Sequence, residues 1–191
     1  MRLDPKTTAL VLIDLQQGIV ARQTAPHSAR DVVDRAAKLA KHFREIGAAV
    51  VLVNVMFSPD DGDRLKPEVD SPTPVTLPIP PSFGELVPEI GPEPNDILIT
   101  KRQWGAFYGT ALELQLRRRG ITTIVIAGIS TNFGVESTAR DAWERNYALV
   151  FAEDAMAAFS AEAHEFAVKN IFPRIGRVRT VGEIVEASPE F

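Results

Sequence analysis

Short apolar runs alternate with amphipathic segments along most of the chain. The apolar runs, which have the length and composition of buried strands, span 9–13, 50–53, 96–100, 123–127 and 148–151, with a shorter one near 177–180. The segments with helical periodicity span 28–47, 110–120, 132–145 and a stretch after Ser160. Strands separated by helices need right-handed crossovers and form a parallel sheet covered on both faces. The pattern therefore predicts a doubly wound α/β domain.

Two of the helical segments carry end signals. Ser28, with Asp31 three residues later, is typical of a capped helix start, and Gly47 supplies a stop at the other end. The run 110–113 predicts a capping box for a second helix. That helix is expected to end at 117–120, where three arginines precede a glycine and suit the helix dipole.

The alternation lapses between residues 57 and 94, where 10 of the 14 prolines lie. A structureless loop of this length is unusual inside a compact domain. Two interpretations stay open: a rigid surface excursion, and a lid or subunit-contact arm. No repeat or linker marks a second domain, so residues 1–191 are expected to form one domain.

Composition narrows the classes of function. The 21 basic and 25 acidic side chains give a net charge of −4, which argues against a general nucleic-acid binder. No apolar run reaches the length of about 18 residues that a membrane helix needs, and the start does not resemble a signal peptide, so we expect a cytoplasmic protein without a membrane partner. The chain has no glycine-rich nucleotide motif, which predicts no nucleotide cofactor.

The chain contains no cysteine. This excludes disulfides, thiolate metal sites and a cysteine nucleophile together. The histidines at 27, 42 and 164 lie far apart in the sequence without metal-ligand spacing, and His42 falls within an amphipathic helix. We interpret all three as surface histidines and predict no metal.

Polar residues follow three of the predicted strands. Asp14 ends the first strand, Lys101 follows the third, and the segment 128–134 joins the fourth to its helix. Ligands of open parallel sheets bind beyond the carboxyl ends of the strands. Each residue alone is more typical of a turn or a solvated charge, but together they predict a site.

Four stretches of the sequence, taken together, closely resemble the isochorismatase-like hydrolase superfamily. They are Val11–Gln16, Lys101–Phe107, Ala127–Ala142 and Ala152–Ala155. The resemblance covers essentially the whole chain and weakens across the proline-rich excursion. It implies a parallel six-stranded sheet of order 3-2-1-4-5-6 and assembly as a homo-oligomer, commonly a dimer or tetramer. It also implies a small-molecule substrate.

Most members of this superfamily resemble nicotinamidases and related amidohydrolases, which use an Asp-Lys-Cys triad. Asp14 and Lys101 match the first two members, whereas the cysteine position is Gly134. An acyl-thioester mechanism is therefore excluded for this chain. Isochorismatases proper are similar in carrying glycine here, and they hydrolyse a vinyl ether with an acid that matches Asp14 and a charged partner that matches Lys101. They have a Tyr-Ala-His run where this chain has Ser130–Asn132, a form closer to the amidohydrolases, so the substrate stays open.

Acid catalysis by Asp14 requires particular surroundings for its carboxyl group and for the substrate. A proton donor must hold its proton near neutral pH, which requires a desolvated pocket around Asp14, whereas Lys101 favours the carboxylate. The segment 128–134 enters a helix and could offer backbone N–H groups to an anion, or Ser130 or Thr131 could simply cap that helix. The resemblance adds a cis peptide between Ile129 and Ser130. The residues predicted to bind substrate are Ile129, Ser130, Asn132, Phe133 and Trp104, with Phe107 and Tyr108 as further pocket walls or as core residues.

Two functions follow from this reasoning. The first is a cofactor-independent hydrolase that acts on a small, ring-bearing or anionic metabolite, with Asp14 as acid/base and Lys101 as its electrostatic partner. The second is a non-catalytic ligand-binding or scaffold protein that has lost its nucleophile.

Overall fold

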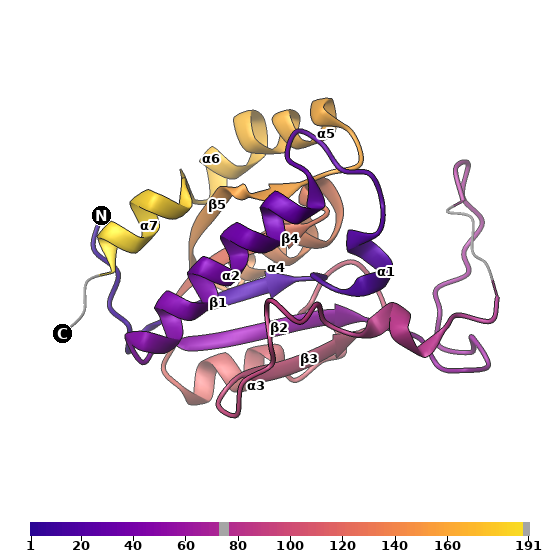
Figure 1. Ribbon diagram of the computed structural model, residues 1–191, viewed down its shortest axis with the longest axis horizontal. Helices are drawn as coiled ribbons and strands as arrows, with labels where there is room; N and C mark the ends of the chain where they lie inside the picture. Colours follow the sequence, from indigo (N-terminus) through magenta and orange to yellow (C-terminus); the bar gives the residue numbers. More distant parts are fainter. Residues whose placement is uncertain (73–76, 189–191) are drawn as a thin grey trace.

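The computed structural model describes residues 1–72 and 77–188. Its centre is one parallel sheet of six strands in the order β3-β2-β1-β4-β5-β6, which confirms the predicted fold class and strand order (Figure 1). The strands are β1 (Thr8–Ile13), β2 (Ala49–Val55), β3 (Ile97–Lys101), β4 (Thr123–Ile129), β5 (Ala148–Ala157) and β6 (Arg177–Arg179). β5 runs six residues beyond the predicted end at 151, which brings Glu153 into the sheet.

Helices cover both faces of the sheet, because side chains alternate along each buried strand. Leu10 and Leu12 of β1 pack on the side of α2 and α7, and Val11 and Ile13 pack on the side of α3, α4 and α6 (Figure 1). The helical elements are α1 (Gln17–Val20), α2 (Ala29–Glu45), η1 (Pro81–Gly84), α3 (Leu112–Arg118), η2 (Thr131–Val135), α4 (Glu136–Glu144), α5 (Ala161–Phe166), η3 (Ala167–Ile171), α6 (Phe172–Ile175) and α7 (Val181–Ala187). No helix in the described part of the chain is long and apolar enough to cross a membrane.

One of the two predicted helix starts is confirmed and the other is wrong. The Ser28 hydroxyl accepts a hydrogen bond from the Asp31 N–H at 3.1 Å, as the capping pattern indicates. The capping box at 110–113 does not form: the helix begins at Leu112, and the Thr110 hydroxyl accepts from the Leu112 N–H at 3.1 Å instead of the Glu113 N–H, while it donates to the Ala106 carbonyl. The Glu113 carboxylate, freed from a capping role, pairs with Arg145 at 2.8 Å.

The proline-rich excursion has two parts. Residues 58–72 and 77–80 project away from the body (Figure 1). The later part returns to it: Leu86 pairs with Gln16, and Val87 and Ile90 are buried in the core beside α2. The choice between a rigid excursion and a lid or contact arm therefore concerns the projecting part alone.

Candidate active site

The first site residue, Asp14, lies directly after β1 and is 6% exposed. Its backbone adopts a left-handed conformation with φ of 53°, which is uncommon for a residue other than glycine. The Asp14 N–H donates to the Val53 carbonyl at 2.9 Å, so the turn stays attached to β2. The side chain is thus fixed at the carboxyl edge of the sheet.

Lys101 is the last residue of β3 and is 2% exposed. Its ammonium group donates to Asp14 Oδ2 at 2.7 Å and to the Gln103 carbonyl at 3.1 Å. Because β2 lies between β1 and β3, the long lysine side chain spans the width of one strand to reach the carboxylate. The structure therefore brings the two residues together as a buried ion pair.

Burial dominates the electrostatics of Asp14. Desolvation raises the pKa of this carboxyl to about 6, although the Lys101 charge and hydrogen bond oppose the shift. The second oxygen, Oδ1, is buried and has no hydrogen-bond partner among the residues that the structure describes. Asp14 is therefore suited to hold a proton closer to neutral pH than an ordinary aspartate.

Gly134 faces the same pair from η2, a turn of π-helix that precedes α4. A Cβ atom built at Gly134 would lie 3.0 Å from Asp14 Oδ2 and 3.0 Å from Ile13 Cγ2. The position to which the resemblance assigns the amidohydrolase cysteine is thus directly beside the ion pair. Here it carries no side chain.

The segment that joins β4 to η2 has two unusual backbone features. The Ile129–Ser130 bond is cis, as the resemblance implies. Gly128 has φ of 126°, and a Cβ there would lie 2.1 Å from the Ile13 carbonyl oxygen, so only glycine fits this close approach to β1. These features set the path of the backbone past Asp14.

The polar groups of this segment do not cap a helix. The Ser130 hydroxyl donates to Asn132 Oδ1 at 2.7 Å, and the Thr131 hydroxyl bonds to a histidine, so the capping alternative is wrong for both residues. The N–H groups of Phe133 and Val135 both donate to the Ser130 carbonyl. Those two donors are occupied, and an anion would have to use other N–H groups of the turn.

The aromatic residues divide between the site and the core. Trp104 and Phe133 stack in a tilted pair with ring centroids 4.7 Å apart, and Trp104 is 61% exposed. The Trp104 carbonyl lies 3.6 Å from the Cβ position of Gly134, so this pair borders the site. Phe107 is buried against Tyr147 and belongs to the core, which excludes it as a pocket wall, whereas Tyr108 is 79% exposed.

Gln16 is a positioning residue that the sequence reasoning missed. Its buried side chain donates to the carbonyls of Val55 and Phe83 and accepts from the Val55 N–H, all within 2.9 Å. It thereby joins the ends of β1 and β2 to η1. The signal available in the sequence was a glutamine two residues after a strand-end aspartate, and its complete burial is seen only in the structure.

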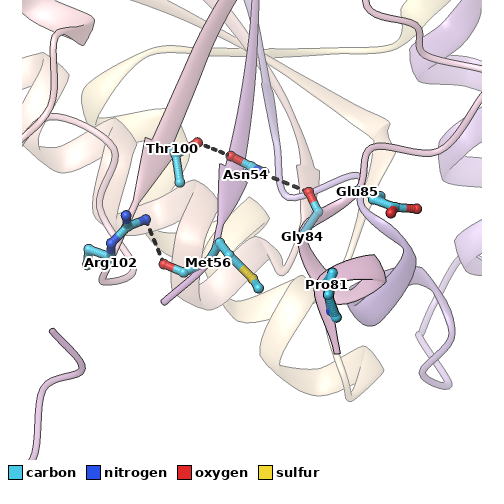
Figure 2. A pocket seen from close by; sticks show the side chains of 7 residues that line it. All are labelled: Asn54, Met56, Pro81, Gly84, Glu85, Thr100 and Arg102. Atoms are coloured by element: carbon cyan, nitrogen blue, oxygen red, sulfur yellow. Dashed lines mark hydrogen bonds between the residues drawn. The ribbon is translucent and has the colours of Figure 1, made fainter. Parts of the chain in front are cut away.

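A cavity of about 270 Å³ lies beyond the ends of β2 and β3 (Figure 2). Asn54 bridges its rim by accepting from Thr100 and donating to the Gly84 carbonyl, both at 2.7 Å. Thr100 and Lys101 are neighbours on β3 and point to opposite faces of the sheet. The cavity is therefore separate from the Asp14–Lys101 pair.

The interpretation of all three histidines as surface residues is wrong for His164. This ring is 3% exposed and bonds through Nδ1 to the Thr131 hydroxyl at 2.8 Å. The ring of His27 meets it edge-on, with centroids 5.9 Å apart. The fold brings these residues together from distant parts of the chain, so spacing in the sequence gave no sign of it.

The geometry agrees with comparisons to known proteins. The profile of the isochorismatase domain matches residues 8–183. The chain belongs to the isochorismatase family. It is 55% identical over 187 residues to the isochorismatase family protein YecD of Escherichia coli O157:H7, covering 98% of this chain and 99% of that one. This family membership supports a hydrolase activity.

Two solved structures extend the comparison. An isochorismatase family protein from Burkholderia thailandensis is 46% identical and superimposes with a TM-score of 0.92 over 97% of both chains. The N-carbamoylsarcosine amidase from Thermoplasma acidophilum is 28% identical, with a TM-score of 0.71 over 92% of this chain and 96% of that one.

Proposed function

We propose that this family member hydrolyses a small metabolite without a covalent nucleophile, with Asp14 as the acid/base and Lys101 as its electrostatic partner. The observation that carries the proposal is the buried Asp14–Lys101 pair, whose carboxyl has a pKa raised to about 6, beside a position that lacks a side chain. A chain without cysteine must use water where the amidohydrolases use a thiol.

A vinyl ether is the substrate class that suits these groups. Protonation of its terminal carbon by Asp14 leaves an oxocarbenium ion and a carboxylate that Lys101 stabilises. Water then adds to the cationic carbon while the carboxylate takes its proton. The resulting hemiketal breaks its C–O bond to give a carbonyl compound and an alcohol, and no cofactor is needed.

Substrate contacts are assigned to the surroundings of Gly134. We assign them to Ser130, Asn132, Phe133 and Trp104, which lie in the cis-peptide segment, in η2 and in the loop after β3, and to the backbone of Ile129, whose side chain is buried in the core beside α2. The Trp104–Phe133 pair offers exposed aromatic faces on which a ring can pack. The homo-oligomer and the cytoplasmic location stay predictions from the sequence.

The second candidate is a non-catalytic ligand-binding protein. It is favoured by the direct ion pair between Asp14 and Lys101 at 2.7 Å, which occupies both groups with each other, and by the missing nucleophile. A library of small anionic metabolites, including the ring-bearing isochorismate and acyclic N-carbamoyl amides, separates the two. Each compound is tested by mass spectrometry for turnover and by the melting temperature for binding. Turnover supports the hydrolase, whereas stabilisation without turnover supports the binding protein and overturns the proposal.

The pH dependence of turnover tests the role of Asp14. Because the proton donor must be protonated, kcat/KM should fall about tenfold per pH unit above the Asp14 pKa of about 6. It should level off below that value, where the acid is fully protonated. Initial rates between about pH 5 and about pH 8 measure this. A rate that rises through pH 6 would instead make Asp14 a base.

The Gly134→Cys variant tests how closely the site follows the amidohydrolases. The new Cβ would lie 3.0 Å from both Asp14 Oδ2 and Ile13 Cγ2, so the thiol would stand beside a base once both side chains move by a few tenths of an ångström. We expect slow hydrolysis of N-carbamoylsarcosine and alkylation of the single thiol by iodoacetamide. Gly134→Ala is the matched control, because it adds the same Cβ without sulfur. A folded Cys variant that gains no amidase activity would show that the pocket has diverged further.

A further inference from the structure

Three side chains that commonly ligate metals meet beside η2, outside the Asp14–Lys101 pair. His27 precedes α2, Glu153 lies in β5 and His164 lies in α5. One ligand atom from each residue lies within 4.8 Å of those of the other two. No short sequence motif links them, because the fold alone assembles the cluster.

One ring nitrogen of His164 has a partner within the protein. Its Nδ1 bonds to the Thr131 hydroxyl at 2.8 Å, which leaves Nε2 for another partner. When Nδ1 carries the proton, Nε2 holds the lone pair that binds a metal, and such a second contact is typical of metal-bound histidines. Neutral imidazole is the form that binds metals.

Glu153 supplies a carboxylate without a direct partner. It makes no hydrogen bond or ion pair with any residue in the two described ranges, and the charges of His27 and Arg35 act on it only through space. The next residue, Asp154, is held in place by Arg35 at its carbonyl and by the Val181 N–H at its carboxylate. The backbone that carries Glu153 is therefore fixed, while the side chain remains available.

The loop that carries His27 is also anchored. Ala25 and Ala158 exchange two backbone hydrogen bonds of 2.9 Å, which pair the loop with the residue after β5. The Thr24 hydroxyl donates to the His27 carbonyl at 2.9 Å. All three ligand-bearing segments are thus positioned before any ion binds, which lowers the entropic cost of binding.

We propose that His27, Glu153 and His164 form a binding site for a divalent transition metal, with Zn²⁺ as the best-matched ion. Two imidazoles and one carboxylate are a ligand set that Zn²⁺ accepts, with water completing the tetrahedron. The ion would join the 21–28 loop to β5 and α5. Through His164 and Thr131 it would also hold η2, the turn that presents Gly134 to Asp14.

The test measures Zn²⁺ binding to the chelator-treated full-length protein by calorimetry. We expect one Zn²⁺ per chain, a melting temperature that rises with Zn²⁺, and visible absorption of a low-symmetry site when Co²⁺ replaces Zn²⁺. His27→Asn and Glu153→Gln should each weaken binding at least tenfold, as even outer-shell changes weaken metal sites about 10–100-fold. His42→Asn is the matched control, because His42 bonds to Ser188 away from the cluster.

The proposal is overturned if Zn²⁺ shows no saturable binding, or if both cluster variants bind it as tightly as the wild type. It is also overturned if His42→Asn weakens binding as much as the cluster variants do. Melting curves of the metal-free variants confirm folding, and since His27 and Glu153 are both partly exposed, either folded variant decides the outcome. Asp14→Asn should keep its Zn²⁺, which separates this site from the proposed catalytic pair.

Discussion

Replacing Asp14 by asparagine should lower turnover of any substrate that the wild type hydrolyses by about 10²–10⁴-fold, the usual contribution of a general acid. The amide cannot supply the proton. It does preserve the backbone of the site, because asparagine tolerates the left-handed conformation at this position, where φ is 53°, although the buried Lys101 charge loses its carboxylate and some stability is lost. Its carbonyl oxygen can still accept the hydrogen bond that Lys101 now donates to Oδ2. A selective loss of kcat is therefore expected.

The measurement compares kcat and KM of the two proteins, with substrate-induced melting shifts as the control for binding. The variant should bind substrate about as well as the wild type, because it loses a proton and not a contact. Full turnover by a folded Asp14→Asn variant would remove Asp14 from the mechanism. Loss of binding together with turnover would instead indicate that the carboxylate positions the substrate.

The sheet could be predicted from the sequence because each buried strand corresponds to a short apolar run. The runs at 9–13 and 123–127 fall within β1 and β4, and the order of strands follows from the family resemblance. The predicted helix starts were less reliable, since they depend on which backbone group a capping hydroxyl binds. Thr110 bonds back to Ala106 in the preceding turn, a choice that the four-residue capping pattern does not encode.

The candidate site was likewise only partly predictable from the sequence. Asp14 follows β1, Lys101 ends β3 and Gly134 lies in the turn after β4, so the strand order places all three at the carboxyl edge of the sheet, and the long Lys101 side chain closes the remaining distance across β2. The pKa of Asp14 could not be predicted from the sequence, because it depends on how far burial, which raises it, outweighs the Lys101 charge, which lowers it. The proximity of His27 to His164 could not be predicted either, because one residue precedes α2 and the other lies in α5. The loop that carries His27 is held in place by backbone hydrogen bonds between Ala25 and Ala158, which leave no pattern in the sequence.

Replacing Lys101 by methionine should destabilise the protein by about 3–5 kcal/mol near pH 8, because breaking a buried pair leaves an uncompensated charge. Asp14 would lose the partner of Oδ2, while Oδ1 already lacks one among the described residues. Methionine has a similar length and keeps most of the apolar contacts. Turnover should fall as well, since the carboxylate formed after proton transfer would no longer be stabilised.

The pH dependence of this loss identifies its cause. Without Lys101 the folded-state pKa of Asp14 rises further above its unfolded value of 3.8, so the native state binds a proton that the unfolded state releases. Stability then falls as pH rises through that range, and the deficit against wild type is largest above the folded pKa and shrinks toward pH 5. Denaturant unfolding at several pH values measures it. Lys169→Met is the control, because Lys169 and Glu165 are paired at the same 2.7 Å in an exposed position where a contact contributes little. A deficit that is constant with pH would mean that lost packing, and not the buried carboxylate, accounts for the effect.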